Sequence, residues 1–139
     1  MTPFEFVQQN YMLIGLAAVS GGMLVWTTVS DRVSGIPSVG PAEATRLMND
    51  DALMLDVREE KEWTTGHIPR SKHIPLSQLK ERAGELEKYK DRPIVINCHS
   101  GSRSAHGCRT LKKLGFQQLY NLAGGISAWQ QANLPVTRK

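Results

Sequence analysis

The segment Cys98-His-Ser-Gly-Ser-Arg-Ser104 combines a thiol, small residues and a fixed positive charge. It follows a β-branched run over 94–97, typical of a buried strand, and precedes a predicted helix over 102–114. Gly101 and the small residues let successive backbone N–H groups point at one centre, where the helix adds the positive end of its dipole. With Arg103 nearby, these groups favour the thiolate, so the segment predicts a reactive Cys98.

The other cysteine, Cys108, has the helical spacing of a core residue relative to Ala105 and Leu111. A metal cluster is not predicted, because His106 and Cys108 lie two apart on one helix and point to different sides. Metal-type CxxC spacing is also missing from the sequence. The chemistry expected at Cys98 needs no cofactor, and the two thiols favour a reducing compartment over a disulfide framework.

Short apolar strands alternate with helices along the chain after residue 39. This alternation predicts an α/β domain over 39–139, with a parallel sheet of about five strands covered by helices on both faces. Ligands bind beyond the carboxyl ends of the strands in such sheets, which is where Cys98 stands. The patterns place strands at 53–57, 72–75, 94–97 and 119–122, and helices at 41–48, 76–89, 102–114 and 125–132.

Three segments resemble signatures of the single-domain rhodanese-like sulfurtransferases, which carry sulfur as a cysteine persulfide. Residues 98–104 resemble the active-site loop of that family. Leu55-Asp-Val-Arg-Glu-Glu-Lys-Glu-Trp-Thr-Thr-Gly-His-Ile-Pro69 is similar to its first signature, and Asn121-Leu-Ala-Gly-Gly-Ile-Ser-Ala-Trp129 to its C-terminal one. The three occur in the order of the family, so the resemblance implies a rhodanese fold and sulfur transfer.

The resemblance assigns roles to the residues of the loop. It implies that Cys98 is the nucleophile and takes sulfur from thiosulfate or from a protein persulfide for delivery to a thiophilic acceptor. Arg103 is expected to hold the anionic end of the donor, and Ser104 to hydrogen-bond the sulfur. The anion is expected to be bound by the backbone N–H groups of His99, Ser100, Gly101, Ser102 and Arg103.

Five residues of the first signature and one departure from it carry secondary expectations. Asp56 is expected to support the loop without reacting, and Arg58 to pair locally with Glu62. Gly66 and His67 are expected to form the turn that follows, which is loop and strand maintenance. Many family members have a small residue after the Ile-Pro pair, where this chain has Arg70; that side chain either adds to a positive rim over the site or faces solvent.

Two other functions are consistent with parts of the pattern. A cysteine phosphatase or arsenate reductase also places a thiolate before a helix, but its motif has five residues between cysteine and arginine, and this loop has four. The shorter loop suits a sulfur atom better than a phosphoryl group. A membrane-tethered binding or regulatory module without turnover is the second alternative, and the presence of Cys98 itself favours activity.

The N-terminal region is uncharged from Phe6 to Ser30 and mainly apolar or small over 11–29. As a helix, that run would be about 28 Å long, close to the hydrocarbon thickness of a bilayer. Tyr11 and Trp26 near its ends suit the membrane interface. We predict a short tail over 1–10, one transmembrane helix over 11–29 and a linker over 30–38. A buried or interfacial helix and a cleaved signal peptide are the alternatives, and a basic n-region for the signal peptide is missing.

The charge distribution predicts the orientation and the partners. All 17 basic residues and 11 of the 13 acidic ones lie in 32–139, which leaves six excess positive charges after the apolar segment. The positive-inside rule then predicts a single-pass protein with its domain in the cytoplasm. Expected partners are a small anionic sulfur donor, membrane lipid and a membrane protein, while nucleic acid is not indicated because basic residues alternate with acids. The basic surface is equally explained as an ordinary solvated one.

Overall fold

The computed structural model describes residues 2–139, except that the side chains of 27–34 lie outside the described set. The chain forms two compact units, Met1–Gly35 and Ile36–Lys139. The boundary between them lies inside the predicted linker over 30–38. Helix continues to Ser34, and Ile36 is already buried in the core of the second unit, so the linker is much shorter than predicted.

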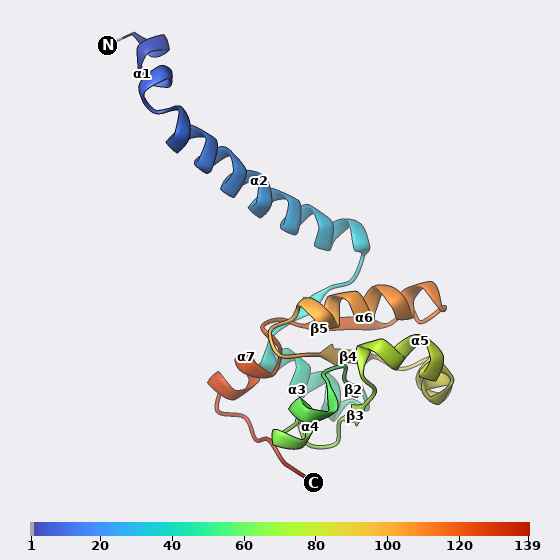
Figure 1. The fold of residues 1–139 in the computed structure, drawn as a ribbon. Helices are drawn as coiled ribbons and strands as arrows, with labels where there is room; N and C mark the ends of the chain where they lie inside the picture. Colours follow the sequence, from blue (N-terminus) through green and yellow to red (C-terminus); the bar gives the residue numbers. More distant parts are fainter. Residues whose placement is uncertain (1) are drawn as a thin grey trace. The chain divides into compact units, whose positions relative to one another are not determined.

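The N-terminal unit consists of two helices, α1 (Pro3–Gln9) and α2 (Tyr11–Ser34) (Figure 1). Thr2 and Glu5 form a reciprocal capping box that begins α1, so part of the predicted tail over 1–10 is helical. The predicted transmembrane helix over 11–29 is not supported: among the described residues, no helix is long and apolar enough to cross a membrane. Residues 27–29 of that prediction fall where side chains are not described.

The second unit is built on a five-stranded parallel sheet in the order β1-β5-β4-β2-β3 (Figure 1). The central strand β4 pairs with β2 through Ile96 and Leu55, and with β5 through Ile96 and Asn121. The strands are β1 (Ser38–Val39), β2 (Leu53–Asp56), β3 (Lys72–His73), β4 (Ile94–Asn97) and β5 (Leu119–Leu122). This confirms the predicted α/β fold with a parallel sheet of five strands.

Helices cover both faces of the sheet, as predicted, because alternate side chains of each strand point to opposite sides. Leu55 and Ile96 belong to one apolar cluster with residues of α5 (Leu79–Arg82), the 3-10 segment η2 (Ala83–Tyr89) and α6 (Ser102–Lys113). Met54 and Val95, one position earlier on the same strands, belong to a second cluster with residues of α3 (Pro41–Asn49) and α7 (Gly125–Gln131).

Three local elements differ from the prediction. Strand β1 and helix α4 (Glu60–Thr65) were not predicted: β1 has two residues, and α4 has no buried side chain and hence no apolar periodicity. The segment predicted as one helix over 76–89 is divided into η1 (Leu76–Gln78), α5 and η2. Only the Leu79 and Leu86 side chains of that segment are fully buried, which is enough to attach it to the sheet without a regular α-helix.

Candidate active site

Cys98 lies directly after strand β4, at the start of a short loop that leads into helix α6. Its Sγ accepts a hydrogen bond from the backbone N–H of Gly101 at 3.0 Å, and the Ser104 hydroxyl oxygen lies 3.4 Å from the sulfur. Gly101 has a φ of 108°, a left-handed conformation that favours glycine and turns the loop back towards the sulfur. The Cys98 side chain is buried, with 1% exposure.

The surroundings of Cys98 lower the pKa of its thiol below the ordinary value. Burial is the largest single influence and acts in the opposite direction, because it disfavours the charged form. The Ser104 hydroxyl and the backbone N–H groups of Ser104, Gly101 and Ser100 together outweigh it. Hydrogen-bond donors placed by the loop and the first turn of α6 therefore favour the thiolate, the nucleophilic form of cysteine.

Helix α7 holds the other side of the same loop. The backbone N–H groups of Ile126 and Ser127 donate to the carbonyl oxygens of Cys98 at 2.8 Å and His99 at 3.2 Å. Gly125 makes this approach possible, because a Cβ atom there would lie 2.3 Å from the Cys98 carbonyl oxygen. The carbonyl groups are thereby directed to α7, while loop N–H groups face the sulfur.

Ser104 is connected to strand β5 as well as to the sulfur. Its hydroxyl lies 2.5 Å from Oδ1 of Asn121 and 3.1 Å from the carbonyl oxygen of Gly101. The Asn121 Nδ2 group donates to that same carbonyl at 3.2 Å. The predicted contact between Ser104 and the sulfur is present, and Asn121 is an additional site residue that the sequence interpretation did not include.

Arg103 pairs with Glu62 of helix α4. The two side chains form a bidentate ion pair, with Nη1–Oε1 and Nη2–Oε2 distances of 2.6 and 2.8 Å. The hydrogen bonds from Arg103 lower the pKa of Glu62 to about 2, so the carboxylate is ionised at physiological pH. The predicted pairing of Glu62 with Arg58 is therefore wrong, because Arg103, 41 positions away in sequence, takes the carboxylate.

Arg58 instead pairs with Asp56 in the protein interior. The guanidinium Nη2 lies 2.8 Å from Oδ2 of Asp56 and 2.7 Å from the carbonyl oxygen of Gly66, and both side chains are buried. Asp56 ends strand β2 opposite Asn97, the residue before Cys98. In the part of the chain that the structure describes, no hydrogen bond joins Asp56 to the loop, so its support of the site acts through the strand and the 56–66 segment.

The remaining predicted positions lie at the rim or in the core. The His99, Ser100 and Ser102 side chains are exposed. Of these three residues, Ser100 has a backbone N–H group that helps to lower the pKa of Cys98. Cys108 is fully buried, as predicted, and burial raises the pKa of its thiol to about 12. Within the described residues, no group of three or more histidine, cysteine or acidic side chains is placed to hold a metal ion.

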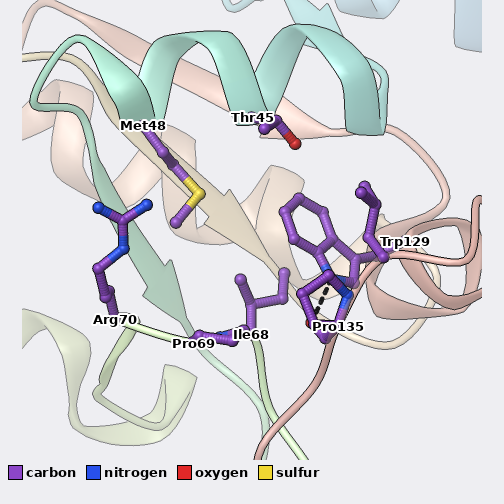
Figure 2. A pocket seen from close by; sticks show the side chains of 8 residues that line it. Thr45, Met48, Ile68, Pro69, Arg70, Trp129 and Pro135 are labelled. Carbon is purple, nitrogen blue, oxygen red and sulfur yellow. Dashed lines mark hydrogen bonds between the residues drawn. The ribbon is translucent and has the colours of Figure 1, made fainter.

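A cavity of about 130 Å³ lies between α3, α7 and the 68–70 turn, and no residue of the 98–104 loop lines it (Figure 2). Trp129, Met48 and Ile68 form much of its apolar wall, and Arg70 lies at one side. Arg70 has a φ of 65°, a left-handed conformation that explains why a small residue suits this position. Its exposed side chain lines this cavity, which agrees with the second of the two expectations, that Arg70 faces solvent.

Comparison with known proteins matches residues 40–132 to the rhodanese-like domain. The chain belongs to the rhodanese-like domain family. YibN of Escherichia coli (strain K12) is 36% identical over 137 residues, which cover 96% of this chain and 95% of YibN. A protein named sulfurtransferase from Allochromatium vinosum is 38% identical over 87 residues, covering 63% of this chain and 79% of that protein.

The fold of this rhodanese-like protein also matches solved structures of the family. The crystal structure of a rhodanese-related protein from Thermoplasma volcanium aligns with a TM-score of 0.68 and 32% identity, covering 74% of this chain and 99% of that one. The likeness to YibN extends beyond the domain into the N-terminal helices, because its coverage exceeds residues 40–132. A rhodanese fold with sulfurtransferase-named relatives supports a sulfurtransferase-like role.

Proposed function

We propose that this rhodanese-like protein is a sulfurtransferase that carries sulfane sulfur as a persulfide on Cys98. The observation that carries the proposal is the hydrogen bond from Gly101 N–H to Cys98 Sγ, made inside a loop whose donors lower the pKa of the thiol. A low-pKa thiolate is a good nucleophile, and the same N–H groups can stabilise the anionic outer sulfur of a persulfide.

The reaction is a double displacement without net oxidation. The Cys98 thiolate attacks the outer sulfur of thiosulfate, the sulfur–sulfur bond of the donor breaks, and sulfite leaves with the bonding electron pair. Cys98 then holds a persulfide. A thiophilic acceptor, such as a thiolate, attacks the outer sulfur, takes it, and returns Cys98 to the thiolate. A persulfide donor reacts in the same way, with a thiolate as the leaving group.

The length of the loop favours sulfur transfer over phosphate-ester hydrolysis. The loop has four residues between Cys98 and Arg103, which makes a compact site around a single sulfur atom. A binding module without turnover would not need a cysteine whose pKa is lowered.

The proposal is tested by turnover with thiosulfate and cyanide, comparing the parent protein with Cys98→Ala and Cys108→Ala. We expect Cys98→Ala to abolish sulfur transfer while the fold is retained. Cys108→Ala is the matched control, because that thiol is buried in the core and has a raised pKa. Turnover that survives in Cys98→Ala would refute the assignment, and hydrolysis of an aryl phosphate by the parent protein would favour the phosphatase.

We further propose that the N-terminal unit associates with a lipid bilayer and leaves the domain in the cytoplasm. The proposal is supported by a series of exposed large apolar side chains on α1 and α2 and by the lack of lysine and arginine before Arg32. Examples are Phe4, Leu13, Leu16 and Trp26, which are 65–74% exposed.

Cell fractionation tests this location. The full chain is expected in the membrane fraction and a variant that begins at Ile36 in the soluble fraction, because the second unit holds the rhodanese core. Carbonate extraction then distinguishes an inserted helix from one bound at the surface. Recovery of the full chain in the soluble fraction would contradict the proposal.

A further inference from the structure

Asn121 lies beside the sulfur-bearing loop although it comes from a neighbouring strand. It pairs with Ile96 across the β4–β5 ladder, two positions before Cys98. Its side-chain amide contacts two groups of the loop and helix α6: the Ser104 hydroxyl and the Gly101 carbonyl. Both of those residues also contact the Cys98 sulfur, so Asn121 completes a closed ring of hydrogen-bonded groups around it.

The direction of these hydrogen bonds follows from which groups can donate. The Gly101 carbonyl can only accept, so the amide must present Nδ2 to it at 3.2 Å. The Oδ1 atom of Asn121 then faces the Ser104 hydroxyl at 2.5 Å and can only accept. Ser104 has one proton, and Asn121 Oδ1 is its nearest acceptor, closer than the Gly101 carbonyl at 3.1 Å or Cys98 Sγ at 3.4 Å.

The Ser104 hydroxyl can therefore donate to only one of two acceptors at a time, Asn121 Oδ1 or Cys98 Sγ. When Cys98 is a thiol, its S–H can donate to Ser104 Oγ while the Ser104 hydroxyl donates to Asn121 Oδ1. When Cys98 loses its proton to solvent, the thiolate becomes a charged acceptor, and the Ser104 hydroxyl must rotate away from Asn121 to donate to the sulfur. Formation of the thiolate therefore breaks the hydrogen bond between Ser104 and Asn121.

We propose that Asn121 is a positioning residue: it accepts the hydrogen bond of the Ser104 hydroxyl and so restrains the ionisation of Cys98. The proposal rests on the proposed function, in which the thiolate is the attacking species. A restrained thiol reacts more slowly with oxidants and alkylating agents. When the Ser104 hydroxyl leaves Asn121, it donates to the thiolate and not to the Gly101 carbonyl. That carbonyl is neutral and already accepts a hydrogen bond from the backbone N–H of Ala105.

The charged groups near Cys98 are not members of this ring of hydrogen bonds. Arg103 is held by Glu62 in a bidentate ion pair, and that carboxylate is ionised at physiological pH. Cys108 remains a neutral thiol because burial raises its pKa to about 12. Changes in the titration of Cys98 upon substitution of Asn121 therefore report on the hydrogen bond that Asn121 makes.

The test is the pH dependence of Cys98 alkylation by iodoacetamide in the full chain, for the parent and for Asn121→Leu. We expect the variant to have a lower Cys98 pKa and to react about threefold faster below it, because Ser104 now donates freely to the thiolate. A purely structural role of Asn121 predicts the reverse, since a displaced Gly101 N–H would raise the pKa. An unchanged or raised pKa would overturn the proposal.

A double-variant cycle supplies the second arm. In a Ser104→Ala background, Asn121→Leu is expected to leave the Cys98 pKa unchanged, because no hydroxyl remains to be released. A shift that persists without Ser104 would overturn the proposal. Asn121→Ala replaces Asn121→Leu if leucine prevents folding, and Asn49→Leu on the exposed end of α3 is the control. Alkylation needs no sulfur donor, so failure of sulfur transfer alone would count against the proposed function only.

Discussion

Gly125 lies against the backbone of Cys98 so closely that a Cβ atom at position 125 would come within 2.3 Å of the Cys98 carbonyl oxygen and 2.7 Å of that of His99. This contact lets the first N–H groups of α7 bind the carbonyl groups of the loop. The two sides of one peptide segment are thus divided, with carbonyl groups held by α7 and N–H groups turned to the sulfur.

Gly125→Ala is expected to reduce sulfur transfer by more than about tenfold, because the added methyl group must displace the loop and the Gly101 N–H with it. Gly125 also has a φ of 57°, so the substitution is strained regardless of space. Turnover and urea unfolding measure the two effects. Gly84→Ala is the control, since a Cβ there meets no atom within 4 Å. Full activity in Gly125→Ala would contradict the role given to α7.

Ser104→Ala is expected to raise the Cys98 pKa and to slow alkylation of Cys98 at neutral pH by about tenfold. Burial raises this pKa, and the variant lacks the Ser104 hydroxyl that lowers it. The folded protein favours the thiolate, so Cys98 adds stability above its unfolded-state pKa and loses it as pH falls through the folded-state value. Alkylation rates from pH 5 to 10 measure the shift, with Thr110→Ala further along α6 as the control. A pKa that does not move would show that Ser104 has no influence on the sulfur.

Glu62→Gln is expected to lower the KM for thiosulfate by severalfold, since the carboxylate no longer competes with the anionic donor for Arg103. The kcat is expected to change less, because Arg103 is not bonded to the sulfur. Because the pKa of Glu62 is about 2, the difference between variant and parent should be constant from pH 5 to 8. Steady-state kinetics measures it, with Glu60→Gln on α4 as the control. An increased KM would indicate that the ion pair itself forms the donor site.

Arg58→Met is expected to destabilise the domain by about 3–5 kcal/mol, because it leaves the Asp56 carboxylate buried without a positive charge beside it. Adding Asp56→Asn is expected to recover part of the loss, since the uncompensated charge is then removed. Urea unfolding followed by circular dichroism measures both, and Arg109→Met on the exposed side of α6 is the control. A loss below about 1 kcal/mol would show that the pair does not hold the 56–66 segment.

The sequence was sufficient for the parts of the molecule that depend on local pattern. The β-branched run of β4, the loop at Cys98 and the first turn of α6 are contiguous, so their chemistry could be predicted directly. Asn121 and Gly125 could not be placed, because their contacts depend on the β4–β5 register and on the position of α7. The partner of Glu62 was predicted wrongly for the same reason: Arg58 is near in sequence, but Arg103 is near in space.

The central claim is that Cys98 carries the sulfur, and mass spectrometry of the full chain after incubation with thiosulfate tests it most directly. The predicted result is a mass increase of one sulfur atom, located on the peptide that contains Cys98, reversed by a thiol acceptor and missing in Cys98→Ala. A folded parent protein that takes up no sulfur from either thiosulfate or a persulfide donor, or that takes it up on Cys108, would contradict the account.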